Sequence, residues 1–160
     1  MLGWICSRLC LLLMALTVIT ACSVTRHDTA QPGIKDLEQP NARSMLAGTA
    51  WQLVEIVSMD DHVYAPEVRS LYTLVFNTDG AMQVRADCNL GTGTWTSESA
   101  GQLQFGPIAA TQALCSPDSL HDRYMAQFQW VRSYVMTDGR LFLATMADGS
   151  IIEFEPVHEK

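Results

Sequence analysis

The chain has 160 residues, enough for one domain of ordinary size, and its 17 acidic and 10 basic side chains give a net charge of −7. This charge excludes an electrostatic surface for nucleic acid and disfavours docking on anionic lipid head groups. Five cysteines are an odd number, and three of them fall in the first 22 residues. Cysteine pairing in the body therefore concerns only the two cysteines that follow the N-terminal segment.

Residues 1–21 are predicted to be a bacterial lipoprotein signal peptide. An apolar run over residues 9–20 is too short to span a bilayer comfortably. It ends at Ile19-Thr20-Ala21-Cys22, where small residues precede a cysteine, as in the lipobox that lipoprotein signal peptidase cleaves. Cleavage would leave Cys22 carrying several acyl chains, such as palmitate, which anchor durably where one chain would not. The alternative is an ordinary cleaved signal followed by an incidental cysteine.

Residues 22–45 are predicted to be a flexible tether, because they are polar, contain Pro32-Gly33 and Pro40-Asn41, and have no apolar period. Residue 23 is Ser and not the Asp that retains bacterial lipoproteins at the inner membrane. The expected location is the outer membrane, facing the periplasm. Loss of residues 1–21 changes the net charge from −7 to −8, so the lipid and not charge is expected to hold the body to the membrane.

The first half of the body is predicted to form β-strands. Apolar alternation begins at Leu46, and the first strand is expected to point Trp51, Leu53 and Val57 to one face. Residues 71–76 and 81–86 are predicted to form a hairpin around an Asn-Thr-Asp-Gly turn.

Two shorter strands are predicted at residues 93–97 and 102–105. The Gly-x-Gly at Gly91 and Gly93 is interpreted as a tight corner between strands, since no helix follows to make it a phosphate loop.

A helix is predicted to begin at Ser116-Pro117-Asp118 and to run to about residue 133. Its apolar face consists of Leu120, Tyr124, Phe128 and Val131, and this stripe indicates core packing, with a partner-binding face as the alternative. Met125 and Trp130 lie off the stripe and are the candidate partner contacts.

Three strands are predicted after the helix, at residues 134–137, 140–145 and 150–155, joined by Asp-Gly turns at 138–139 and 148–149. The fold class is therefore mainly β with one helix (α+β). About eight strands are expected to form an antiparallel curled sheet or a cracked β-barrel, with the helix packed on its end or seam.

Cys88 and Cys115 are the two cysteines of the body, and in an oxidising compartment they most simply form a disulfide. The loop that they close would contribute about 3–4 kcal/mol in the chain-entropy model. A reactive or metal-binding thiol pair is the alternative, disfavoured by the lack of a C-x-x-C motif, a nearby His and a flanking basic residue. Asn89 is expected to hydrogen-bond residues 90–93 and fix the corner.

Four stretches of the body resemble the META/HslJ-like domain over residues 46–156. They are Leu46-x-Gly48-Thr49-x-Trp51-x-Leu53, Phe76-x-x-Asp79-Gly80, Cys88-Asn89 followed by Gly93, and Thr111-Gln112-Ala113-Leu114-Cys115. The resemblance implies a small β-barrel-like domain with a helix, often in a lipoprotein. It also implies an association with envelope stress, without an established catalytic activity. The structural motif residues are Gly48, Thr49, Trp51, Asn89, Gly93 and Thr111.

No catalytic set, metal site or cofactor site is predicted. The four histidines have no ligand spacing, and no serine lies in a nucleophile elbow. The expected function is a non-enzymatic, lipid-anchored binding or chaperone-like accessory in outer-membrane maintenance or stress response, with an unidentified envelope protein as partner.

Two alternatives to this function remain. One is a carrier of a small apolar ligand inside the barrel, which an interior filled by Trp51, Phe76, Trp95 and Phe154 would oppose. The other is an envelope protease inhibitor or an uncharacterised enzyme.

Overall fold

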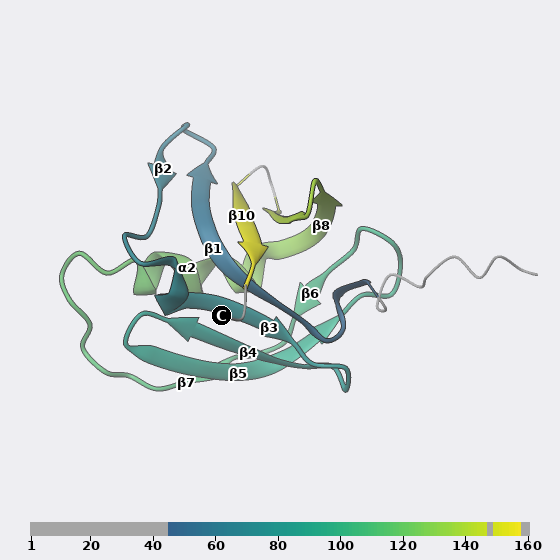
Figure 1. Ribbon diagram of the computed structural model, residues 1–160, viewed down its shortest axis with the longest axis horizontal. Helices are drawn as coiled ribbons and strands as arrows, with labels where there is room; N and C mark the ends of the chain where they lie inside the picture. The colour runs from purple at the N-terminus through teal and green to yellow at the C-terminus, as the bar shows by residue number, and fades with distance from the viewer. Residues whose placement is uncertain (1–44, 147–148, 158–160) are drawn as a thin grey trace, which may run out of the picture. The chain divides into compact units, whose positions relative to one another are not determined.

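The computed structural model describes residues 45–146 and 149–157, which form an antiparallel β-structure with one short helix (Figure 1). The predicted signal peptide, Cys22, residues 23–44 of the tether and Asp148 of the last predicted turn lie outside the described residues. The strands are β1 (Thr49–Ser58), β2 (Val63–Tyr64), β3 (Tyr72–Phe76), β4 (Ala81–Ala86), β5 (Asn89–Thr96), β6 (Gln104–Phe105), β7 (Ala109–Ala110), β8 (Val131–Thr137), β9 (Arg140–Thr145) and β10 (Ser150–Pro156). The helical elements are η1 (Arg69–Leu71), α2 (His121–Gln127) and η2 (Phe128–Trp130).

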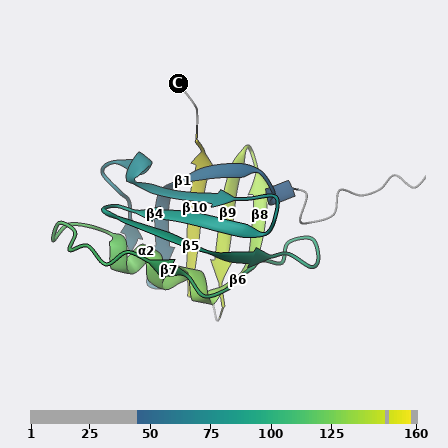
Figure 2. The same ribbon diagram turned by 90° about the horizontal axis from the view of Figure 1, so that it is seen from below.

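The sheet has the order β6-β5-β4-β3-β1-β10-β9-β8, with β2 added to β1 and β7 added to β5. Its two ends meet, because a bridge joins Gln102 to Ser133 and the Leu103 amide donates to the Arg132 carbonyl at 3.1 Å. Figure 2 shows β8, β9 and β10 running steeply across β4 and β5. The sheet is thus nearly closed into a barrel with one seam, as predicted. The two strands that the prediction missed, β2 and β7, have two residues each.

Strand β1 spans both halves of the sheet, and a bulge interrupts its register with β10 between Leu53 and Glu55. A bulge adds one residue and reverses which side chains face the core. Trp51 and Leu53 are buried as predicted, but Ile56 is buried beyond the bulge and Val57 faces outward. The expectation that Val57 shares the face of Trp51 is therefore wrong.

The two predicted hairpin turns that lie wholly within the described residues have the chemistry expected of them. Gly80 has φ 90°, and the Asp79 carboxylate accepts a hydrogen bond from the Ala81 amide at 2.9 Å. Asp138 and Gly139 both have positive φ, as a two-residue type I′ turn requires.

The helix is shorter than predicted. It begins at His121 and not at Ser116, because the backbone before it is held elsewhere: the Leu120 amide donates to the Tyr72 hydroxyl at 2.9 Å. It gives way to η2 at Phe128, and Val131 already pairs with β9. The apolar stripe itself is confirmed, since Tyr124, Phe128 and Val131 are buried and Leu120 packs against the core.

The predicted corner at Gly91 and Gly93 is wrong, because both glycines lie within β5. A Cβ on Gly91 would come within 2.9 Å of the Ile108 side chain, and one on Gly93 within 3.0 Å of the Pro107 carbonyl oxygen. The glycines thus let residues 106–110 cross β5 closely. The predicted strand at 93–97 is the second part of β5, and that at 102–105 is reduced to β6.

The interior of the barrel is filled by side chains. Trp51, Phe76, Trp95 and Phe154 are each at most 4% exposed. Aromatic rings continue this core toward the helix, with centroids 5.2 Å apart for Phe76 and Trp95 and 5.0 Å apart for Tyr124 and Phe128. Burying rings of this size supplies much of the driving force for folding.

Candidate functional site

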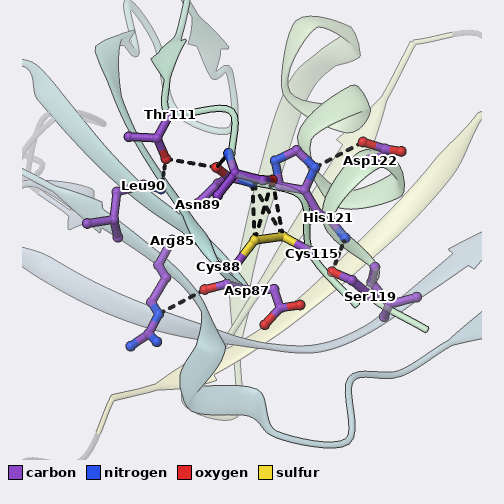
Figure 3. Close-up of a disulfide and its surroundings, with 12 residues drawn as sticks. Arg85, Asp87, Cys88, Asn89, Leu90, Thr111, Cys115, Ser119, His121 and Asp122 are labelled. Carbon is purple, nitrogen blue, oxygen red and sulfur yellow. Dashed lines mark hydrogen bonds and ion pairs between the residues drawn. A yellow bond between two sulfur atoms is a disulfide. The ribbon is translucent and has the colours of Figure 1, made fainter. Parts of the chain in front are cut away.

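The predicted disulfide is present and joins Cys88 to Cys115 (Figure 3). Cys88 and Cys115 are joined with their Cα atoms 5.6 Å apart, a separation typical of disulfides. Cys88 sits in the two-residue turn between β4 and β5, where Ala86 pairs with Asn89. Asp87, the other residue of the turn, has φ 56°, and its amide donates to the Leu71 carbonyl at 2.7 Å. The bond therefore ties an exposed turn to residues 111–115.

Asn89 forms the centre of this site and is 1% exposed. Its Oδ1 accepts hydrogen bonds from the Ala113 amide at 2.7 Å and from the Thr111 hydroxyl at 2.8 Å. Its Nδ2 donates to the Ala113 carbonyl at 2.9 Å. The side-chain amide thus pairs with the main chain of Ala113 much as a neighbouring strand would, and it extends the pairing of β5 with β7.

The predicted partners of Asn89 are corrected by this geometry. Its side chain bonds residues 111–113 and not residues 90–93, because residues 90–93 continue β5 away from it. Thr111 completes the arrangement, since its hydroxyl accepts from the Leu90 amide at 3.0 Å and its own amide donates to the Leu90 carbonyl. We name this set, Cys88, Asn89, Thr111, Ala113 and Cys115, the Asn89 clamp.

An open hollow of about 480 Å³ lies beside the clamp, lined by residues 112–117 with Ser119, His121 and Asp122. His121 Nδ1 lies 2.9 Å from the exposed Asp122 carboxylate, and His121 Nε2 is buried without a hydrogen-bond partner among the described residues. The Tyr72 hydroxyl, 3.2 Å from the Ser119 hydroxyl, ties this segment to β3. Sequence reasoning missed Tyr72, because its partners are 47 residues away.

The motif residues Gly48, Thr49 and Trp51 form a second set of hydrogen bonds where β1 begins. Gly48 has φ 77°, and its amide donates to the Phe76 carbonyl. The Thr49 hydroxyl donates to the Leu46 carbonyl at 2.6 Å and accepts from Trp51 Nε1 at 2.7 Å. The positive φ explains the glycine, and the two bonds of Thr49 explain why a hydroxyl stands between Gly48 and Trp51.

The two candidate partner contacts differ in exposure. Trp130 is 49% exposed, whereas Met125 is half-buried and packs against the core. Met125 therefore offers less surface than expected, because its side chain packs against the core and lines a shallow hollow together with residues 105–108.

Among the described residues, the titratable groups do not form a second centre with the arrangement of a metal site. Within residues 45–146 and 149–157, no group of three or more His, Cys, Asp and Glu side chains is placed to hold a metal ion. His62 pairs with Asp60 in the β1–β2 turn, and two of the four histidines, His27 and His158, lie outside the described residues. In the same part of the chain, no helix has the length and apolar character needed to cross a membrane.

Among the described residues, Tyr124 is the most buried titratable group, with 0% exposure and no hydrogen-bond partner for its hydroxyl. Burial raises the pKa of this phenol well above its ordinary value. On the surface, Glu155 accepts from Arg69 and Gln52. The hydrogen bond from Arg69 is the main cause that lowers the Glu155 pKa.

Comparisons with known proteins agree with this geometry. A family model described as the META domain matches residues 44–158. A protein from Burkholderia xenovorans solved by NMR shares 19% identity and a TM-score of 0.61, covering 85% of this chain and all of its own. A DUF4847 family protein from Bacteroides vulgatus shares 14% identity and a TM-score of 0.54, covering 74% of this chain and 99% of its own. These likenesses concern the fold. No curated protein matches the chain.

Proposed function

Because the chain belongs to the META domain family, we propose that it is a lipid-anchored envelope protein that acts by binding and not by catalysis. It serves as a binding or chaperone-like accessory in outer-membrane maintenance or stress response. Its body faces the periplasm and is joined to the lipid anchor by the tether that follows Cys22.

The filled barrel interior carries this proposal. The four aromatic residues that would line a ligand cavity are at most 4% exposed, and they pack with aliphatic side chains such as Leu53, Leu143 and Ile152 that are 0% exposed. A carrier of apolar molecules needs an interior space of some hundreds of Å³. The core of this barrel is occupied, so a partner would meet the protein on its outer surface.

Three further observations support the envelope location. The Ile-Thr-Ala-Cys run ends the apolar segment at Cys22, where a lipobox is expected. The disulfide between Cys88 and Cys115 is typical of proteins in oxidising compartments. The acidic body has little attraction for anionic lipid, which favours an acyl anchor.

Crosslinking in intact cells tests the binding function. The full chain is crosslinked in its own envelope, purified under denaturing conditions, and the attached molecules are identified. A reproducible envelope protein partner, lost when Cys22→Ala releases the chain from the membrane, is the expected result. Recovery of an extractable apolar molecule from the uncrosslinked protein would instead favour the carrier function.

A further inference from the structure

Residues 111–116 form an exposed segment without helix or strand, between β7 and α2. Figures 1 and 2 both show this green connection projecting past the helix at the edge of the body. All of its residues are exposed except Cys115, which is half-buried, and the Leu114 side chain is 100% exposed. A single exposed leucine is common on protein surfaces and indicates nothing by itself. What distinguishes Leu114 is that both of its neighbours in the chain are fixed.

The residue before Leu114 is held by hydrogen bonds, and the residue after it is held by a covalent bond. The main-chain amide and carbonyl of Ala113 are both bonded to the buried Asn89 side chain, at 2.7 Å and 2.9 Å. Cys115 is joined to Cys88 by the disulfide. The body therefore fixes the main chain on either side of Leu114. A partner that binds this segment loses little affinity to ordering it, because the segment is ordered in advance.

The main-chain groups of this segment alternate between bonded and free, as along the edge strand of a sheet. Thr111 and Ala113 bond inward, to the beginning of β5. The main-chain amides and carbonyls of Gln112 and Leu114 have no hydrogen bond among the described residues. An extended segment with a free edge can pair with a partner as an added strand. Serine endopeptidases bind the substrate chain before the scissile bond in this way, with the last side chain before that bond in a specificity pocket.

We propose that residues 111–116 are an inhibitory loop for a serine endopeptidase with an apolar specificity pocket. Leu114 enters that pocket, and the free main-chain groups of Gln112 and Leu114 pair with the main chain of the enzyme. The Leu114–Cys115 peptide bond then lies at the nucleophile of the enzyme. The open hollow of about 480 Å³ beside residues 112–117 leaves space on one side of this bond. This role rests on the proposed binding function and specifies the class of the protein partner.

The disulfide explains why this loop inhibits the enzyme and is not consumed by it. Hydrolysis of the Leu114–Cys115 bond adds one water and leaves a carboxylate on Leu114 and an amino group on Cys115. The two fragments remain joined, because Cys88 lies in the first and Cys115 in the second. Asn89 holds Ala113, and with it the new carboxyl end. The amino group therefore stays beside the carboxyl carbon and reforms the peptide bond with loss of the same water, as an intramolecular reaction at high effective concentration.

Inhibition assays on the purified, oxidised full chain in mild detergent test the proposal. Chymotrypsin is the probe, because its apolar pocket accepts leucine, and its activity is measured on a small chromogenic substrate as the concentration of the chain rises. We expect lasting inhibition of chymotrypsin and none of trypsin, whose pocket carries a carboxylate for basic side chains. No inhibition of chymotrypsin, or cleavage at Leu114–Cys115 with full return of its activity, would overturn the proposal.

An exchange of specificity locates the residue that enters the pocket. Leu114→Lys should weaken the inhibition of chymotrypsin at least about tenfold and should create inhibition of trypsin. This side chain is fully exposed, so the substitution leaves the core intact. Met59→Lys, at a 73% exposed position in the β1–β2 turn, is the matched control and should inhibit both enzymes as the wild type does. Equal inhibition of trypsin by the two variants would refute the role of Leu114.

Mass spectrometry after prolonged incubation with chymotrypsin tests the retained bond. We expect intact chain to persist beside chain that has gained the mass of one water and that separates into two fragments at Leu114–Cys115 only after reduction. Complete hydrolysis of this bond would overturn the proposal. A reproducible envelope partner in the crosslinking experiment, together with no inhibition of chymotrypsin, would leave the binding function standing and reject the inhibitory loop.

Discussion

Replacing Asn89 by alanine should destabilise the protein more than any other single polar substitution at the Asn89 clamp. The side chain is 1% exposed and makes three hydrogen bonds of 2.7–2.9 Å to Thr111 and Ala113. At a net value of about 1 kcal/mol each, they sum to about 3 kcal/mol. Ala113 and Thr111 are exposed, so water can replace part of what is lost. The expected loss is about 2 kcal/mol.

Urea denaturation of the oxidised chain, followed by tryptophan fluorescence, measures this loss. Asn89→Asp is the matched control, because it keeps the shape and the oxygen that accepts from Thr111 and Ala113 but places a second carboxylate oxygen against the Ala113 carbonyl. We expect Asn89→Asp to be at least as destabilising as Asn89→Ala at pH 7. A loss below about 0.5 kcal/mol for Asn89→Ala, the usual scale of neutral surface substitutions, would refute the role of the clamp. A well-tolerated Asn89→Asp would refute its donor geometry.

Burial, charge and covalent structure give four more expected outcomes. Replacing both cysteines of the disulfide by alanine should lower the free energy of unfolding by about 3.6 kcal/mol in the chain-entropy model. The wild-type body should react with thiol reagents only after reduction, and thiol labelling before reduction would contradict the pairing. Tyr124→Phe should raise the free energy of unfolding by about 1 kcal/mol, since it removes a buried hydroxyl without a partner, whereas the control Tyr72→Phe, which loses bonds to residues 119 and 120, should lower it. Burial raises the pKa of Tyr124, so the unfolded chain loses its phenol proton first and the free energy of unfolding falls as the pH rises above about 10. Denaturation curves at alkaline pH should show a smaller fall for Tyr124→Phe than for the wild type. The lowered pKa of Glu155 affects stability at acid pH: the contribution of this carboxylate to the free energy of unfolding is present above about pH 4.3 and is lost as the pH falls through the pKa of the folded state. The Glu155→Gln variant should therefore lose less stability between pH 7 and pH 3 than the wild type. Equal losses in the two proteins would show that the Arg69 hydrogen bond has no such effect.

Features set by neighbouring residues could be predicted from the sequence. The turn before Ala81 and the Asp138-Gly139 turn depend on residues within four positions, and both hairpins form as expected. The buried stripe of Tyr124 and Phe128 follows from helical spacing alone. The pairing of the two body cysteines needed only their number and the expected compartment.

Features set by distant contacts could not be predicted in this way. The bulge after Leu53 reflects how β1 pairs with β10, about one hundred residues later. Gly91 and Gly93 are needed because residues 106–110 cross them, and the sequence around the glycines gives no sign of that crossing. Asn89 finds its partners 22 and 24 residues away.

The outward row across β1, β10 and β9 also depends on tertiary structure. This row combines strands from both ends of the body, and the order β1-β10-β9 had to be known before Val57, Ile151 and Ala144 could be placed side by side. The half-burial of Met125 has the same origin, since this side chain packs against a core built from strands distant in the sequence.

The lipid anchor is the claim on which the envelope function depends, and metabolic labelling with a palmitate analogue tests it most directly. The full chain and its Cys22→Ala variant are expressed side by side, and incorporation is measured in the membrane fraction. We predict label in the wild type and none in Cys22→Ala; equal labelling of the two chains, or no label in either, would contradict the account.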